Sequence, residues 1–155
     1  MRVKVHVIGL NRADAMFREG DYGPIPTLPS QLGYEVSGEV EAVGHGVTNF
    51  VAGDAVSTIP AFDMGRYGVY GDTAIVPASA VVKHPPSLSW PEAASIWMQY
   101  LTAYGALVQI GGLAAGEAVI ITAASSGVGL AAIQIANSLG AIPSPQPGRA
   151  RSAPH

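Results

Sequence analysis

The stretch Ala118-Val-Ile-Ile-Thr122 runs directly into Ala123-Ala-Ser-Ser-Gly-Val-Gly129, and the sequence then continues with helical periodicity from Leu130 to Leu139. A short apolar run, a group of small residues and a periodic segment predict a buried strand, a tight turn and a helix. The start of such a helix presents backbone N–H groups and the positive end of its dipole, which favour anions. The stripe expected to pack on the strand is Val128, Ala131, Ile135 and Leu139.

The spacing of small residues in this turn is typical of a dinucleotide site. Such a site needs small residues at three places: one for the tight turn, one for close approach to the pyrophosphate and one for helix–strand packing. These places fall on Ala124, Ser126 and Gly129. The candidate cofactor-binding residues of the turn are Ala124, Ser125, Ser126, Gly127, Val128 and Gly129. Two of the three expected glycines are replaced, so an ordinary strand-to-helix turn is the alternative.

Composition excludes several classes of function. The chain has 155 residues, of which 48% are hydrophobic, and its net charge of −3 gives no basic surface for nucleic acid. It has no cysteine, which excludes disulfides and thiolate metal sites and fits a reducing compartment. No apolar run reaches the ~20 residues of a membrane span, and the start does not resemble a signal peptide. We therefore expect a cytoplasmic protein without nucleic-acid or membrane partners.

The first two-thirds of the chain are rich in predicted β-strands. Val3, Val5 and Val7 alternate with polar residues, and Asn11 and Gly20 are typical of a helix start and stop. Further strands are expected at 34–43, 47–50, 55–59, 69–76 and 81–84. Short strands at this spacing, separated by glycine turns, predict a small barrel or sandwich. The capping box Ser89-Trp-Pro-Glu92 opens helical sequence that reaches Ile110, with Gly105 as its weak point.

Six segments occur together in the order and at the spacing of a known superfamily. They are Gly9-Leu-Asn-Arg-Ala-Asp14, Leu32-Gly-Tyr-Glu-Val-Ser-Gly38, Val43-Gly-His-Gly-Val47, Gly53-Asp-Ala-Val56, Leu101-Thr-Ala-Tyr104 and Ala123-Ala-Ser-Ser-Gly-Val-Gly129. With these segments the chain resembles the zinc-independent, quinone oxidoreductase branch of the medium-chain dehydrogenases/reductases. The resemblance implies a homodimer that binds NADPH or NADH and transfers hydride to a quinone or an activated carbonyl or alkene acceptor.

The resemblance also implies a mixed α and β fold with three parts. A chaperonin-10-like β-barrel domain, lacking the first strands of its relatives, is expected at 1–88. The linking helices and the first strand and helix of an incomplete Rossmann fold follow at 89–141. Residues 142–155 carry four prolines and are expected to form a disordered tail. The chain is thus expected to be truncated at both ends and inactive or self-associating by itself. The alternative function is that of a non-catalytic truncated product or a β-domain binding module of the same family.

The resemblance further assigns residues outside the turn. Asn11 stands where zinc-dependent relatives have a cysteine ligand, and Tyr34-Glu35 stands where they have a His-Glu pair, so no zinc is expected. His6, His45, His84 and His155 do not lie at ligand spacing.

Asn11 is expected beside the nicotinamide ribose or the substrate, Thr102 near the nicotinamide amide and Tyr22 over the cofactor or substrate. The alternatives are a helix N-cap, an ordinary helix threonine and a packed loop tyrosine. Since the cofactor carries the chemistry of this reaction, no acid–base residue is assigned.

Overall fold

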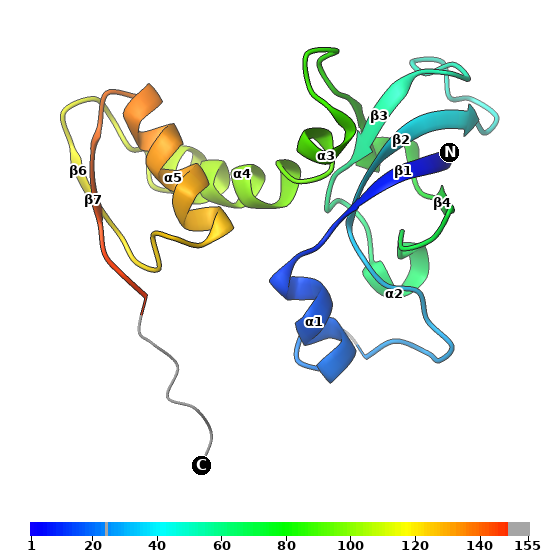
Figure 1. Cartoon of the computed structure of the whole chain (residues 1–155), viewed down its shortest axis with the longest axis horizontal. Helices are drawn as coiled ribbons and strands as arrows, with labels where there is room; N and C mark the ends of the chain where they lie inside the picture. Colours follow the sequence, from blue (N-terminus) through cyan, green and yellow to red (C-terminus); the bar gives the residue numbers. More distant parts are fainter. Residues whose placement is uncertain (24, 149–155) are drawn as a thin grey trace. The chain divides into compact units, whose positions relative to one another are not determined.

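The structure, a computed structural model, describes residues 1–23 and 25–148. The chain divides into two compact units between Met98 and Gln99. The first unit contains an antiparallel sheet with short helices around it, and the second contains a helix that lies along two parallel strands (Figure 1). Each unit is described by itself.

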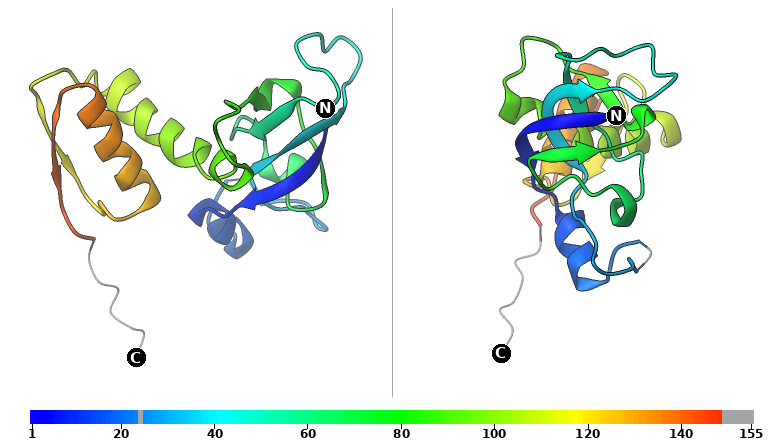
Figure 2. Two further views of the ribbon diagram at one scale, coloured as in Figure 1. Left: turned by 45° about the horizontal axis from the view of Figure 1, so that its top comes forward. Right: turned by 90° about the vertical axis from the view of Figure 1, so that its right-hand side faces the viewer.

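The sheet of the first unit has five strands in the order β4-β1-β2-β3-β5. The strands are β1 (Arg2–Gly9), β2 (Glu35–Ala42), β3 (Ala55–Thr58), β4 (Thr73–Ile75) and β5 (Val81–Lys83), and every pair is antiparallel. Irregular register in the β1–β2 pair accompanies the curvature of the sheet that is visible in Figure 2.

Apolar or small residues alternate with more polar residues along most of β1 and β2. Because successive side chains of a strand point to opposite faces, this alternation places one set of valines on the inner face. The buried core of the first unit consists of Val3, Val36, Val40, Phe50, Val56, Val69, Ala74, Val76 and Val81. The expectation of a small chaperonin-10-like β domain is confirmed by the family match described below.

Helix α1 (Arg12–Glu19) begins after Asn11 and ends at Gly20, as the sequence predicts. Gly20 adopts a left-handed conformation with φ of 83°, which glycine tolerates best. The unit also contains α2 (Met64–Tyr67), the 3₁₀ turn η1 (Ala78–Ala80) and α3 (Trp90–Ala93), and α3 follows the predicted capping box at Ser89.

Two of the expected strands are wrong or too long. Residues 47–50 form no strand, and only Thr73–Ile75 of the expected 69–76 belongs to the sheet. Phe50, Val69 and Val76 nevertheless pack in the core, and the Val69 N–H bonds to the Gly33 carbonyl outside the sheet ladders. Apolar residues that enter the core from loops produced the misleading strand pattern.

The predicted continuous helix from Ser89 to Ile110 is also wrong. Helix α3 ends early, α4 (Trp97–Tyr104) starts separately, and a π-helical segment η2 (Gly105–Ile110) follows. The change of helix type begins at Gly105, where the sequence is weakest in helix propensity. Within the described residues no helix is long and apolar enough to cross a membrane.

The second unit contains β6 (Ala118–Ile121), α5 (Gly127–Ser138) and β7 (Ile142–Pro145). Strand β7 pairs in parallel with β6, and this corrects the expectation that disorder begins at Ile142. Prolines at every second position suggested a loop. The Ile142 N–H nevertheless donates to the Glu117 carbonyl, and the Gln146 N–H donates to the Ile121 carbonyl, each at 2.8 Å. The prolines of β7 occupy the intervening positions, where no ladder donor is needed. Residues 149–155 of the expected tail lie outside the described residues.

The buried face of α5 is rotated relative to the expected stripe. Val128 is 42% exposed, whereas Gly129, Ala132 and Ala136 are buried together with Ala131. Small residues replace large ones on this face because the helix lies close to the turn and to both strands. The stripe that contained Val128 was therefore only partly correct.

Gly38 provides a test of the first unit. A Cβ at Gly38 would lie 2.0 Å from the Lys4 carbonyl oxygen of β1. Gly38→Ala must therefore push β1 and β2 apart, and we expect it to lower the free energy of unfolding by about 1–3 kcal/mol. Urea unfolding followed by the fluorescence of Trp90 and Trp97 measures this loss.

The matched control is Gly44→Ala, because a Cβ at Gly44 meets nothing within 4 Å. We expect that variant to stay within about 0.5 kcal/mol of the wild type. Equal stabilities for the two variants would contradict the close approach of the strands at Gly38.

Candidate functional site: the turn at the start of α5

The turn between β6 and α5 depends on a left-handed residue. Ala123 has φ of 50°, an uncommon conformation for a residue with a side chain. The sequence interpretation gave the tight-turn role to Ala124, and the structure corrects it by one residue. The Ser126 N–H donates to the Ala123 carbonyl at 2.9 Å, which closes the turn just before the helix begins.

Gly129 lies where helix and turn approach most closely. A Cβ at this position would lie 2.6 Å from the Ala123 carbonyl oxygen and 2.7 Å from the Ala124 Cα, which are backbone atoms. Contacts below 3.0 Å with backbone cannot be relieved by rotating a side chain. Gly129 therefore allows α5 to lie close to the turn that follows β6.

The first turn of α5 offers backbone donors. Ser126 caps the helix, since its Oγ accepts the Gly129 N–H at 3.0 Å. Among the residues that the structure describes, none provides an acceptor for the N–H groups of Gly127 or Val128. Free N–H groups at the start of a twelve-residue helix can bind an anion such as a phosphate.

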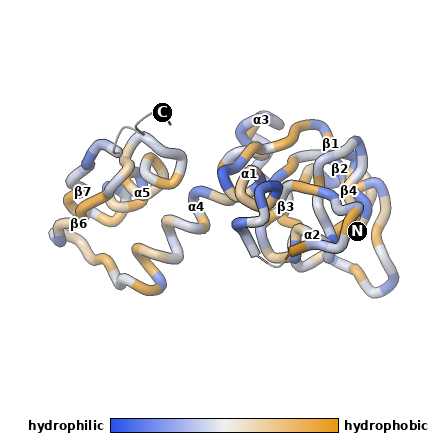
Figure 3. The backbone as a smooth tube through the Cα atoms, turned by 90° about the horizontal axis from the view of Figure 1, so that it is seen from below, coloured by the Kyte–Doolittle hydropathy of each residue, from blue (hydrophilic) through white to orange (hydrophobic). Residues whose placement is uncertain are grey.

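The surroundings of this turn are almost uncharged. From Gln99 to Gly148 the sequence contains one charged residue, Glu117, and Figure 3 shows few strongly hydrophilic residues in this part of the chain. An anion at the turn would therefore be held by backbone N–H groups and the helix dipole, without a salt bridge from residues 99–148.

Gln99 is a neighbour of the turn that the sequence interpretation missed. It lies on α4, and its Oε1 would be 2.2 Å from a Cβ at Gly127. Gly127 therefore makes room for a polar side chain over the turn. A helical glutamine has no motif around it that would have revealed this role. Thr102 is exposed on the same helix.

A second polar group lies in the first unit, around Asn11. The Asn11 Nδ2 donates to Glu35 Oε2 at 3.0 Å, and Glu35 Oε1 accepts the backbone N–H groups of Trp97 at 2.6 Å and Met98 at 3.2 Å. The Asn11 backbone N–H donates to Asp14 Oδ2 at 2.7 Å, so the N-cap alternative for Asn11 is correct in its backbone geometry.

Burial controls the electrostatics of this group. It raises the pKa of Glu35 above its ordinary value, and the three hydrogen bonds to the carboxylate oppose that rise. Burial also raises the pKa of Tyr70 well above its ordinary value, helped by the hydrogen bond from Tyr70 to Asp14. Asp14 Oδ1 is buried without a hydrogen-bond partner among the described residues.

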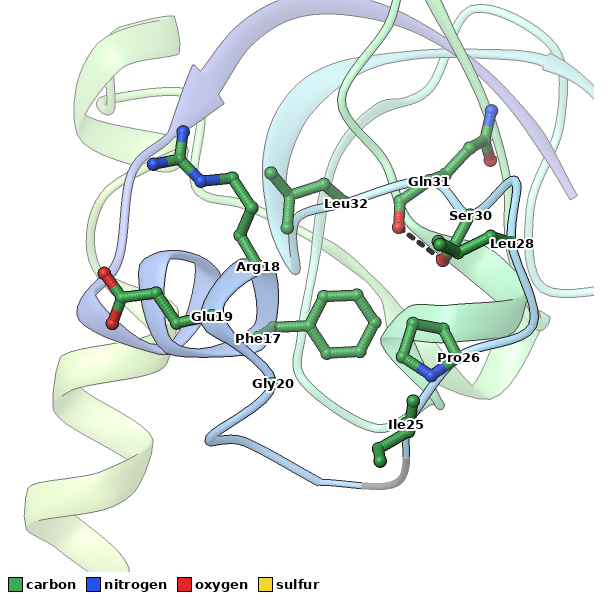
Figure 4. A pocket seen from close by; sticks show the side chains of 10 residues that line it. All are labelled: Phe17, Arg18, Glu19, Gly20, Ile25, Pro26, Leu28, Ser30, Gln31 and Leu32. Atoms are coloured by element: carbon green, nitrogen blue, oxygen red, sulfur yellow. Dashed lines mark hydrogen bonds between the residues drawn. The ribbon is translucent and has the colours of Figure 1, made fainter.

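Two hollows adjoin α1. One, of about 290 Å³, is lined by Asn11, Asp14, Arg18, Tyr70 and apolar neighbours. The other, of about 360 Å³, is shown in Figure 4, where the Phe17 ring faces Pro26 and the Arg18 and Glu19 side chains point away from that space. The sequence interpretation missed the second hollow, because the proline loop gave no sign that it would fold back against α1.

Tyr22 lines neither hollow. Its ring meets that of Tyr34 edge-on, with 6.3 Å between centroids, and Tyr34 packs in turn against Phe62 at 5.2 Å. Burial raises the pKa of Tyr34, and the proximity of Tyr22 adds to the shift. These contacts favour the packed-tyrosine alternative for Tyr22.

His6 and His84 have structural surroundings, whereas His45 is exposed in a turn. His84 is buried, with its Nδ1 at 3.0 Å from Ser57 Oγ, and both His84 and His6 contact the Trp90 ring. Within residues 1–23 and 25–148, no group of three or more histidines and acids is placed to hold a metal ion. His155 lies outside the described residues.

Comparisons with known proteins agree with this geometry. Residues 1–86 match the family model of the alcohol dehydrogenase GroES-like domain. The chain is 39% identical over 138 residues to human quinone oxidoreductase, covering 89% of this chain and 41% of that protein. It is 41% identical over 140 residues to quinone oxidoreductase of Pseudomonas aeruginosa, covering 90% and 42%. The chain thus spans about two-fifths of the length of these relatives.

A solved structure shows the same relationship. Escherichia coli quinone oxidoreductase, complexed with NADPH, superposes with a TM-score of 0.85 at 35% identity, covering 97% of this chain and 44% of that one. The family match covers more than half of the present sequence, and the structural match extends through both units. The chain therefore belongs to the medium-chain dehydrogenase/reductase superfamily and carries its alcohol dehydrogenase GroES-like domain.

Proposed function

We propose that this chain supplies the β domain and the start of the cofactor-binding domain of an NAD(P)H-dependent oxidoreductase of the quinone oxidoreductase type. The observation that carries the proposal is the geometry at the start of α5. The N–H groups of Gly127 and Val128 have no acceptor among the described residues, and Gly129 lets the helix lie close to the backbone of the turn. NADPH binding by the related E. coli quinone oxidoreductase supports the same assignment.

The turn residues fit the pyrophosphate of a dinucleotide. Gly127 and Val128 would donate backbone N–H groups to it, and Ser126 would keep the first turn of the helix in place. When bound, the nicotinamide would supply the hydride. Asn11 and Thr102 are proposed to contact the nicotinamide ribose and amide, respectively, and Tyr22 remains a proposed substrate neighbour.

The proposed acceptor is a quinone or an activated carbonyl or alkene. Its reduction needs an oriented cofactor in a site that excludes water, and no side-chain nucleophile. We propose that the reaction is independent of zinc, because amide, phenol and carboxylate groups at Asn11, Tyr34 and Glu35 do not form a typical tetrahedral zinc set. A cytoplasmic location and a homodimeric complete enzyme belong to the same proposal.

The turn is tested by Gly129→Val. The new side chain would collide with the backbone of Ala123 and Ala124 and move α5 away from the pyrophosphate position. We expect NADPH to shift the amide NMR signals of Ser125 to Gly129 in the wild type. In the variant we expect the affinity to fall by at least tenfold, about 1.4 kcal/mol.

The control for Gly129→Val is Asn137→Val, which introduces the same side chain at an exposed position of the same helix. It should leave the NADPH-induced shifts unchanged. If Gly129→Val and Asn137→Val bound NADPH equally well, the turn would be excluded from the site.

We also propose that the chain by itself self-associates and shows no turnover of NADPH with a quinone. The β6–β7 sheet carries α5 on one face, and on the other face Ile120 is 72% and Ile142 60% exposed. Apolar side chains on an uncovered sheet favour association. We expect Ile120→Lys/Ile142→Lys to remain monomeric in analytical ultracentrifugation at concentrations at which the wild type associates.

Ile75→Lys is the matched control for this association. Ile75 is a similarly exposed isoleucine of β4 in the other unit, so its replacement should leave association unchanged. A wild-type chain that stays monomeric and sustains quinone-dependent NADPH oxidation would contradict both parts of this prediction.

A further inference from the structure

Glu35 is a buried acid with three hydrogen-bond donors around it. Only 2% of its surface is exposed, although it lies at the first position of β2. One oxygen accepts the backbone N–H groups of Trp97 and Met98, and the other accepts the Asn11 amide. Since a buried polar group needs partners, this arrangement satisfies both carboxylate oxygens.

The arrangement determines which way the Asn11 amide faces. A carboxylate oxygen accepts hydrogen bonds, so the Asn11 atom that faces Glu35 Oε2 must be the NH2 group. No partner of Glu35 can accept a carboxyl proton, because all three donate through N–H. The hydrogen bond to Glu35 therefore determines the orientation of the Asn11 amide.

The other ionisable groups near Glu35 do not compete for this role. Asp14 is engaged with the Asn11 backbone and the Tyr70 hydroxyl, and it acts on Glu35 only through its charge. Tyr70 bonds to Asp14 and to the Gly9 carbonyl. Asn11 is thus the one side chain among the described residues that Glu35 orients by a direct hydrogen bond.

We propose that Glu35 is a positioning residue, which holds the Asn11 amide in one orientation for ligand binding while it caps the first turn of α4. This inference rests on the proposed function, in which Asn11 contacts the nicotinamide ribose or the substrate. Asn11 also lines the hollow of about 290 Å³ beside α1, so its orientation sets the pattern of donor and acceptor that a ligand meets there.

The test exchanges donor and acceptor in the hydrogen bond between Asn11 and Glu35. In Glu35→Gln the carbonyl oxygen can still accept the Trp97 and Met98 N–H groups, but the new NH2 group faces the NH2 group of Asn11. The Asn11 amide must then rotate by half a turn. In the double variant Asn11→Asp/Glu35→Gln a carboxylate faces the new NH2 group, which restores the hydrogen bond in the opposite sense.

Two measurements on the full chain follow. In NMR spectra, Glu35→Gln should move the side-chain amide signals of Asn11, while Glu41→Gln, an exposed acid of the same strand, should not. In thermal unfolding, Asn11→Asp alone should lower Tm by roughly 5 °C or more, because it places two carboxylates together. The double variant should be more stable than Asn11→Asp, although aspartate and asparagine cap helices equally well.

Unmoved Asn11 signals in Glu35→Gln, or additive Tm losses in the double variant, would overturn the positioning role. These readouts need no cofactor, so they separate this inference from the proposed function. NADPH should bind Glu35→Gln about three- to tenfold more weakly than Glu41→Gln, which corresponds to one misplaced hydrogen bond. If the Asn11 signals respond but NADPH affinity does not, the role of Asn11 in cofactor binding is wrong.

Discussion

The close approach between Gly129 and the backbone of Ala123 and Ala124 is the constraint on which the second unit depends. It needs a left-handed residue at Ala123 and the absence of a side chain at Gly129. It also explains why α5 buries alanines in place of larger residues. The same approach fixes the start of the helix, where backbone N–H groups remain available. In this unit the close approach at Gly129 therefore accounts both for the packing of α5 and for the proposed anion site.

In the first unit the corresponding role belongs to a buried carboxylate. Glu35 joins the start of β2, the residue before α1 and the first turn of α4 through hydrogen bonds of 2.6 to 3.2 Å. The free-energy cost of burying Glu35 is offset by three N–H donors from two separate chain segments, Asn11 before α1 and the start of α4. The zinc-dependent relatives implied by the sequence resemblance place an acid at this position too, and here its observed partners are N–H groups.

Much of this could be predicted from the sequence, because the decisive signals are local. The helix limits at Asn11 and Gly20, the capping box at Ser89 and the glycine at 129 each act through a few neighbouring residues. The errors arose where the structure of a segment depends on residues that are distant in the sequence. Phe50 and Val69 pack in the core from loops, β7 forms despite its prolines because β6 supplies the ladder, and Gln99 reaches the turn from another helix. No periodicity within a segment encodes such contacts.

The central claim is that the backbone at the start of α5 holds the pyrophosphate of NADPH. A crystal structure of the chain grown with NADPH tests it most directly. The account predicts pyrophosphate oxygens within hydrogen-bond distance, about 2.7–3.2 Å, of the Gly127 and Val128 nitrogens. An ordered NADPH whose phosphates lie elsewhere, with the N–H groups of Gly127 and Val128 bonded only to water, would contradict it.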